Sequence, residues 1–225
     1  MRRFVLGDVH GNYRGLKQCL KRSGFDDERD LLVSLGDLCD RNIGTKEVFN
    51  ELLKIKNFKM AIGNHDQWML EWSETGNIPV DWMYNGGYQT VCSYNFREPP
   101  KRHVELLSKA VSLIKIDDKI FVHAGIDANK SLEDQSECFV TWDRTFLERI
   151  QKIHKKEPGK RFFDFESVFI GHTPTLVMDA DVPQRFCNVW CMDTGSGFWP
   201  GRLTIMDIDT KEYWQSDHTW ELYAV

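Results

Sequence analysis

The sequence predicts a mixed α/β fold, of the α+β kind, in one domain of residues 1–225. Three observations lead to this prediction. Short apolar runs alternate with amphipathic stretches at the start of the chain, an aromatic-rich segment interrupts them, and further apolar runs follow without long helices between them. A content of 41% hydrophobic and 28% charged residues is typical of a globular domain that buries a sizeable core.

The first sixty or so residues predict a β-α-β-α-β unit. Apolar runs of strand length alternate there with stretches of helical periodicity. In chain order, the expected strands and helices are residues 4–6, 13–22, 31–35, 45–55 and 59–62. Such alternation predicts parallel strands with helices packed on them.

The middle of the chain, residues 68–112, is rich in Trp, Tyr, Asn and Gly and predicts helices and loops. Its last helix is expected at residues 100–112. We expect this segment to form a small helical cap over the sheet. Its aromatic residues, Trp82 among them, are expected to pack the cap rather than to stack on a ligand.

The second half of the chain predicts a further series of strands. Because no long helix is expected among the later ones, this part of the sheet should be antiparallel or mixed. The expected strands are residues 114–116, 120–123, 168–170, 186–192, 203–208 and 212–214.

Composition excludes several classes of protein. The net charge of −5 argues against binding to duplex nucleic acid, which requires a basic surface. Each apolar run is well below the roughly 20 residues needed to cross a bilayer. The apolar run at the start of the chain is also too short for a signal peptide. We therefore expect a cytoplasmic protein with no membrane contact. Its six cysteines, without a C-x-x-C pair, are expected to be buried free thiols.

Polar residues recur just after the expected strands. Ligand sites of open α/β sheets lie outside the carboxyl ends of the strands, so these side chains should meet at one edge. In chain order they are Asp8, His10, Asp37, Asn64, His123 and His172.

These side chains are of the types that bind divalent cations. Carboxylates supply charge, imidazoles supply directional nitrogen donors, and an amide carbonyl fills a neutral position. Burying so many polar groups without a cation would be costly. Glycines beside nearly every candidate allow the tight turns that such a site needs. The pattern predicts a metal site.

Five motifs in this order resemble those of the calcineurin-like metallophosphoesterase family, above all its compact bacterial and phage Ser/Thr protein phosphatase branch. They are GDVHG at 7–11, GDLCDR at 36–41, GNHD at 63–66, HAG at 123–125 and GHT at 171–173. The resemblance implies a β-sandwich of mixed sheets flanked by helices. It also implies two divalent metal ions, with manganese expected and iron or zinc as alternatives.

The resemblance also implies a role for each candidate. Asp37 would bridge the two metals. Asp8 and His10 would complete one metal site, and the other would be completed by Asn64, His123 and His172.

Four further residues are assigned to catalysis by the same resemblance. His65 matches the general acid, and Asp40 matches the carboxylate that orients it. Arg41 and Arg144 match the phosphate-binding arginines, and Asn64 is expected to contact the substrate as well. A hydroxide held between the metals would attack phosphorus while His65 protonates the leaving oxygen.

Two positions depart from the protein phosphatase pattern. Asn42 stands where Gly is usual. Asn tolerates a left-handed backbone better than most residues, so the turn can be kept. Asp66 replaces Glu, as in the symmetrical dinucleoside tetraphosphatases, yet those enzymes tend to lose the acid at Asp40.

We therefore expect a phosphomonoesterase of the Ser/Thr protein phosphatase type that acts on a phosphorylated substrate. The alternative is a symmetrical dinucleoside polyphosphate hydrolase. A non-catalytic scaffold is disfavoured because the predicted site is complete.

Overall fold

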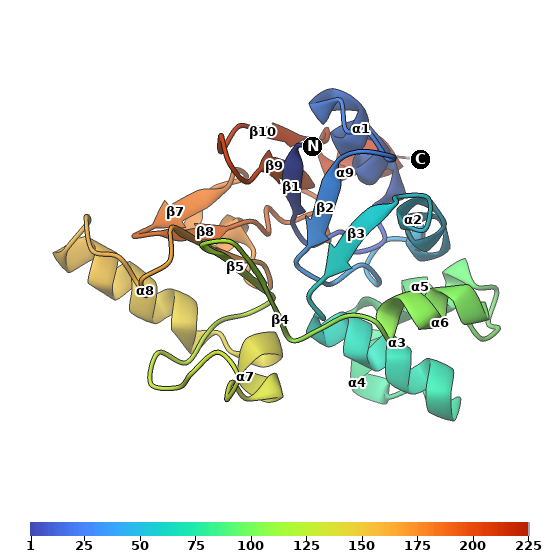
Figure 1. The fold of residues 1–225 in the computed structure, drawn as a ribbon. Coiled ribbons are helices and arrows are strands. Elements are labelled where there is room, and N and C mark those ends of the chain that lie inside the picture. The colour runs from blue at the N-terminus through green and yellow to red at the C-terminus, as the bar shows by residue number, and fades with distance from the viewer. Residues whose placement is uncertain (225) are drawn as a thin grey trace.

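Two five-stranded sheets pack face to face, and helices cover their outer faces (Figure 1). The computed structural model describes residues 1–224. This arrangement confirms the predicted mixed α/β class and the mixed sheets that the resemblance implied.

The first sheet has the order β10-β9-β1-β2-β3. Its strands are β1 (Arg3–Leu6), β2 (Leu31–Ser34), β3 (Asn57–Met60), β9 (Thr204–Asp207) and β10 (Tyr213–Gln215). Strands β1, β2 and β3 are parallel and are joined by α1 (Tyr13–Ser23) and α2 (Thr45–Leu52), as the β-α-β-α-β prediction requires. The C-terminal strand β9 lies antiparallel beside β1.

The second sheet has the order β4-β5-β6-β8-β7. Its strands are β4 (Leu113–Ile116), β5 (Lys119–Val122), β6 (Ser167–Ile170), β7 (Gln184–Phe186) and β8 (Val189–Cys191). The single strand expected at residues 186–192 is wrong. The structure divides it into a β7–β8 hairpin, because the chain turns at Cys187 with a left-handed φ of 57°.

The segment after β3 is helical, as predicted, although its boundaries differ. It contains α3 (Asn64–Thr75), α4 (Val80–Trp82), the π-turn η1 (Met83–Gly87), α5 (Tyr88–Ser93) and α6 (Lys101–Leu107). The last helix ends before residue 112 because Val111 leaves it to form a bridge with Ala61.

Four helical elements were not predicted. They are α7 (Glu137–Trp142), α8 (Thr145–Lys156), the 3-10 helix η2 (Thr175–Met178) and α9 (Thr219–Tyr223). A signal for α8 was present, since Phe146 and Ile150 lie four residues apart on its buried face. Asp143 also caps this helix by accepting from the Phe146 amide at 2.6 Å.

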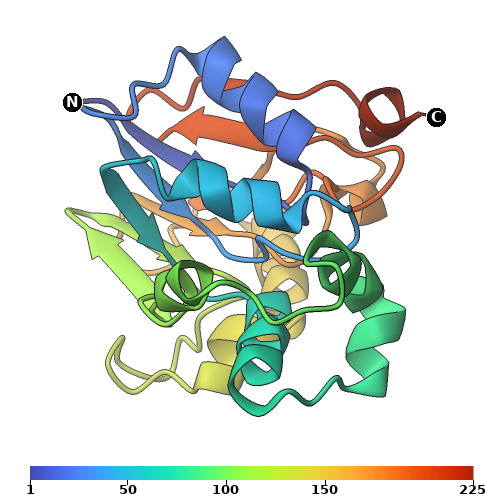
Figure 2. The same cartoon turned by 90° about the vertical axis from the view of Figure 1, so that its right-hand side faces the viewer.

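Strands β2, β5, β6 and β9 are buried along their whole length, which explains their largely apolar sequences. Val5, Phe121 and Phe169 point into the layer between the sheets, where the two phenyl rings stack with centroids 5.0 Å apart. Phe4 and Leu6, the neighbours of Val5, point to the opposite face. Helices α1 and α2 cover that outer face (Figure 2).

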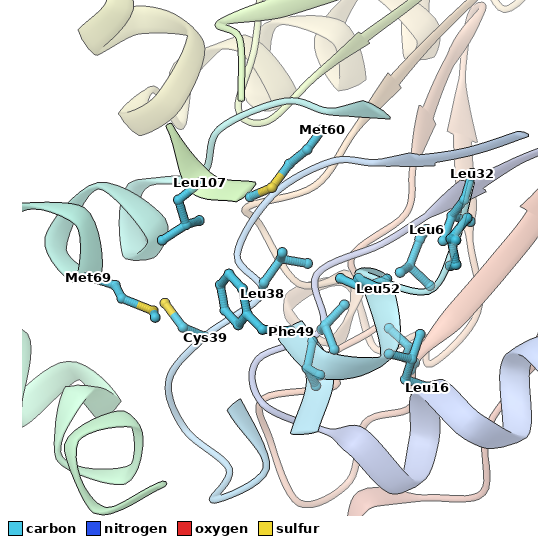
Figure 3. Close-up of a cluster of buried hydrophobic side chains, with 14 of the residues drawn as sticks. Leu6, Leu16, Leu32, Leu38, Cys39, Phe49, Leu52, Met60, Met69 and Leu107 are labelled. Atoms are coloured by element: carbon cyan, nitrogen blue, oxygen red, sulfur yellow. The ribbon is translucent and has the colours of Figure 1, made fainter. Parts of the chain in front are cut away.

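The outer cluster of the first sheet reaches from α1 to the helical segment (Figure 3). Leu16 of α1 and Phe49 and Leu52 of α2 pack against it, and Met69 and Leu107 extend it into α3 and α6. The helical segment is therefore fixed to the first sheet by a continuous apolar contact.

Within residues 1–224, no helix is both long and apolar enough to span a bilayer. The six cysteines are free thiols, as predicted, but not all of them are buried. Cys138 is exposed and Cys92 is half-buried.

Candidate metal centre

The predicted ligands gather where β1, β2, β3, β5 and β6 end, at the junction of the two sheets. Several of them hold left-handed backbone conformations that non-glycine residues rarely adopt. The φ angles are 48° at His10, 50° at Asp37 and 66° at His172. Such strain is typical of functional sites, where the surrounding structure enforces it.

The carboxylate of Asp37 lies at the centre of this group. Its Oδ2 is 3.6 Å from Nε2 of His10, 3.5 Å from Nε2 of His123 and 4.0 Å from Nε2 of His65. Its Oδ1 accepts a hydrogen bond of 3.0 Å from the His65 amide. Gly63 is required beside it, because a Cβ there would lie 2.1 Å from Oδ1.

Backbone carbonyls orient two of the imidazoles. His10 donates from Nδ1 to the carbonyl of Cys39 at 3.0 Å, and His123 donates from Nδ1 to the carbonyl of Leu35 at 2.8 Å. Each Nε2 therefore presents a lone pair toward Asp37. Protein metal sites fix their histidine ligands in this way.

Asn64, which follows β3 of the first sheet, and His172, which follows β6 of the second, lie on the His123 side of the group. Oδ1 of Asn64 is 3.1 Å from Nε2 of His123, so two atoms with lone pairs face each other. A cation bound by both would satisfy them. His172 donates from Nε2 to the carbonyl of Trp142 at 3.3 Å, which leaves its Nδ1 available to a metal.

The structure brings the candidates into two clusters that share Asp37. One contains His10, Asp37 and His65, and the other contains Asp37, His123 and His172. Asp37, for which a bridging role was predicted, is the residue common to both clusters. His65, expected to be the general acid, lies in the first cluster, where Asp8 was expected as a ligand.

Asp8 provides the clearest test of whether these residues fit a cation. Its Oδ2 accepts from the His172 amide at 2.9 Å, whereas its buried Oδ1 has no hydrogen-bond partner among residues 1–224. Burial, together with Asp193 and Asp37, raises the pKa of Asp8 well above its usual range. A bound divalent cation would satisfy Oδ1 and offset this cost, so the residues present fit the metal pair that the pattern predicts.

Burial also keeps the imidazoles neutral, the form that binds metals. It lowers the pKa of His10 and of His123, and it lowers the pKa of His172 to about 3 with a further contribution from His123. Burial opposes ionisation of Asp37 too, but His123, His65 and the other imidazoles outweigh it, and the pKa of this carboxyl falls.

His65 and Asp40 form a buried pair. The imidazole donates from Nδ1 to Oδ2 of Asp40 at 2.6 Å, which turns Nε2 toward Asp37. Burial lowers the pKa of His65, but Asp37 and Asp40 outweigh burial and raise it above its usual value. Two residues that the sequence pattern did not assign to the site hold Asp40, namely Trp82 and Thr90.

The two candidate arginines lie on different sides of the centre. Arg41 places its guanidinium 4.5 Å over the ring of Phe198, and its buried Nε has no hydrogen-bond partner in the described chain. Arg144 approaches the carbonyl of His172 at 3.5 Å and Oγ1 of Thr173 at 3.4 Å. Both contacts of Arg144 are long, so its guanidinium keeps donors for another ligand.

The two departures from the family pattern have structural roles. Asp66 accepts from the amides of Asp37 at 2.6 Å, Leu38 at 2.9 Å and Gly63 at 3.1 Å, and so fixes the loop that carries Asp37. In this turn Asp40 and Arg41 hold the left-handed conformations, so Asn42 does not need the tolerance that Asn offers. Asn42 donates from its side-chain Nδ2 to the carbonyl of His10 at 2.8 Å.

Comparison with known proteins is consistent with this geometry. A family model described as calcineurin-like phosphoesterase matches residues 1–193. Serine/threonine-protein phosphatase 2 of Escherichia coli (strain K12) is 38% identical, over 91% of this chain and 92% of its own length. The symmetrical bis(5'-nucleosyl)-tetraphosphatase of Buchnera aphidicola subsp. Schizaphis graminum (strain Sg) is 30% identical, over 74% of this chain and 56% of its own.

A solved metallophosphoesterase from Sphaerobacter thermophilus has the same fold. It superposes with a TM-score of 0.62 over 97% of this chain and 89% of its own, at 17% sequence identity.

Proposed function

The chain belongs to the calcineurin-like phosphoesterase family, whose members are metal-dependent hydrolases, and we propose that it is a dinuclear phosphomonoesterase of the Ser/Thr protein phosphatase type. One observation carries the proposal. Next to a carboxylate that two candidate metal clusters share, His65 is held by Asp40 with its second nitrogen directed into the site.

The proposed ligands follow from the geometry and the motifs together. Asp8, His10 and Asp37 would hold one cation. Asp37 would also hold the second cation, together with Asn64, His123 and His172. When bound, the two cations would supply Lewis acidity toward the phosphoryl oxygens and activate water at neutral pH. We infer manganese as the native metal, with iron and zinc as alternatives that the same donors accept.

His65 is the proposed general acid. Its Nδ1–H is committed to Asp40, and its Nε2 carries the proton that passes to the leaving oxygen. The raised pKa of His65 favours the protonated form that a general acid requires. Asp40 keeps the ring in one tautomer and one orientation throughout.

Arg41 and Arg144 are the proposed phosphate-binding residues, with Asn64 as a further substrate contact. A guanidinium matches two phosphate oxygens in bidentate geometry and stays charged at any working pH. The unpartnered Nε of Arg41 supports this role, because a buried N–H donor without an acceptor is costly.

A phosphoprotein substrate is favoured over a dinucleoside polyphosphate by sequence similarity. This chain is 38% identical to the E. coli phosphatase over 92% of that protein, and 30% identical to the Buchnera tetraphosphatase over 56% of that protein. The acid at Asp40, paired with His65, points the same way. We also infer a cytoplasmic location, since free thiols suit a reducing compartment.

The proposal is tested by comparing kcat/KM for phosphoserine and phosphothreonine peptides with kcat/KM for diadenosine tetraphosphate on manganese-loaded protein. We expect the phosphopeptides to be preferred. A clear preference for the dinucleotide would overturn the phosphatase assignment and favour the alternative. Metal analysis of fully active protein should give two ions per chain, and fewer would contradict the dinuclear centre.

A further inference from the structure

Trp82 makes a contact that packing alone does not require. Its indole Nε1–H donates to Oδ2 of Asp40 at 2.7 Å, and this is the same oxygen that accepts from His65 at 2.6 Å. Trp82 and Asp40 are both completely buried, and they lie 42 residues apart in the sequence. The Asp40 carboxylate thus joins the imidazole of His65 in α3 to Trp82 in α4.

Thr90 holds the other oxygen of the same carboxylate. Its hydroxyl donates to Oδ1 of Asp40 at 2.7 Å, and its oxygen accepts from the Asp40 amide at 2.8 Å. The hydroxyl hydrogen is then used, so Thr45, 3.1 Å away, must be the donor in the Thr45–Thr90 contact. Asp40 is therefore fixed at both its side chain and its backbone.

The neighbouring Arg41 is held by the same segment. Asp40 and Arg41 have φ angles of 76° and 63°, a conformation that costs energy for non-glycine residues. The amide of Arg41 donates to the carbonyl of Gly86 at 3.0 Å. Gly86 itself must be glycine, because its φ is 108° and a Cβ there would lie 2.7 Å from the Arg41 nitrogen.

We propose that Trp82 is a positioning residue for proton transfer, which with Thr90 holds Asp40 so that Asp40 holds His65 against the leaving group. The inference rests on the proposed function, in which His65 is the general acid. In this proposal residues 80–93 orient the Asp40–His65 pair in addition to packing over the sheet. Trp82 acts through Asp40 and His65 and does not touch the substrate.

The test uses two esters that differ in their need for a proton. The serine alkoxide of a phosphoserine peptide leaves only when protonated, whereas p-nitrophenolate is a stable anion that leaves without a proton. The quantity measured is the ratio of kcat on the phosphoserine peptide to kcat on p-nitrophenyl phosphate. A loss of general-acid function lowers this ratio, while a general structural defect lowers both rates alike.

Trp82→Phe removes the N–H and keeps most of the ring. We expect it to lower the ratio about tenfold, the scale of a lost group that orients a site residue. The matched control is Trp72→Phe. Trp72 is a buried tryptophan whose ring lies 5.6 Å from that of Trp82, and its indole makes no hydrogen bond to Asp40 in the described chain. The control should keep the wild-type ratio.

Thr90 provides a second, independent pair of variants. Thr90→Val should lower the ratio, and Thr90→Ser, which restores the hydroxyl, should return it to the wild-type value. Metal content is measured in every variant, so that loss of cations is recognised as the cause where it occurs.

His65→Asn separates the inference from the function on which it rests. If His65→Asn lowers the ratio while Trp82→Phe and Thr90→Val leave it at the wild-type value, the positioning role is wrong and the proposed function stands. An unchanged ratio in His65→Asn overturns the general-acid assignment itself. Equal losses on both esters in Trp82→Phe would assign Trp82 to packing alone.

Discussion

The position of the Asp8 carboxylate requires glycine at residue 171. A Cβ at Gly171 would lie 2.0 Å from Oδ1 of Asp8, the same buried oxygen that has no hydrogen-bond partner in the described chain. Substitution there would displace a proposed metal ligand without changing its chemistry. Substitution at position 171 therefore tests how strongly metal binding depends on the position of the Asp8 carboxylate.

We expect Gly171→Ala to weaken metal binding about 10- to 100-fold, the range seen when supporting residues of a metal site are changed. Titration of the chelator-treated protein with manganese, followed by activity and bound metal, measures the effect. Gly159→Ala is the matched control, because a Cβ at Gly159 meets nothing within 4 Å. Equal metal affinity in the two variants would show that Asp8 does not bind metal.

Asp37 should be the least replaceable side chain. Its carboxylate belongs to both candidate clusters, so Asp37→Asn removes the negative charge from two cation sites at once. We expect turnover to fall to background because both ions are lost, and metal analysis should show this directly. Retention of two ions in an inactive Asp37→Asn protein would contradict the bridging role.

At the scale of elements, α6 is held by a buried histidine. His103 stacks on Phe49 of α2 with centroids 5.3 Å apart, and it lies 2.8 Å from the hydroxyl of Tyr94. Burial, with Arg102 and Lys46 nearby, lowers the pKa of His103 to about 4. The folded state therefore contains this imidazole in its neutral form.

The lowered pKa predicts a loss of stability in acid. The unfolded chain gains a proton at His103 near its ordinary pKa of about 6.5, whereas the folded chain does not. The contribution to stability is thus complete above pH 6.5 and is lost as the pH falls toward about 4, by up to about 3 kcal/mol.

Denaturant unfolding of wild type and His103→Gln between pH 4 and 7.5 measures this contribution. The difference between the two proteins is the relevant quantity, because other buried histidines titrate in both. If the free energy of unfolding changes with pH equally in wild type and in the variant, His103 is not held neutral.

Element boundaries were predictable where both faces of a strand are buried. The runs at β1, β2, β5 and β6 are wholly apolar or nearly so, and the sequence placed each within a residue or two. The β7–β8 hairpin was not predicted because its turn at Cys187 carries no Gly or Pro. Helix α8 was missed although its apolar spacing was present.

At the scale of the whole molecule, the centre joins the two sheets. Asp8, Asp37 and Asn64 follow strands of the first sheet, while His123 and His172 follow strands of the second. The Nδ1–H of His123 donates to the carbonyl of Leu35, which again links one sheet to the other. Bound cations should therefore tie the sheets together.

Chelation with EDTA should abolish activity and lower the melting temperature. A ligand present at 100 times its Kd stabilises the folded state by about 2.7 kcal/mol, so the shift should amount to several degrees. Hydrogen exchange should rise mainly in the segments after β5 and β6. Exchange that is unchanged there on metal removal would mean that the sheets pack equally well without the cations.

The proposed ligands could be selected from the sequence because a strand end marks each of them, but their neighbours could not. Trp82 reaches Asp40 across 42 residues, and nothing in the local sequence distinguishes it from Trp72, which only packs. Contacts of this kind depend on how the helical segment lies against the sheet. Periodicity and motif spacing carry no information about that placement.

The position of β9 bears on how the protein is made. Strand β1 pairs with β2 on one side and with β9, residues Thr204–Asp207, on the other, while the family model ends at residue 193. A ribosome adds about 5–20 residues per second, so the flank of β1 stays open for tens of seconds after it emerges. Until β9 arrives, that exposed strand edge is a site for aggregation and for chaperone binding.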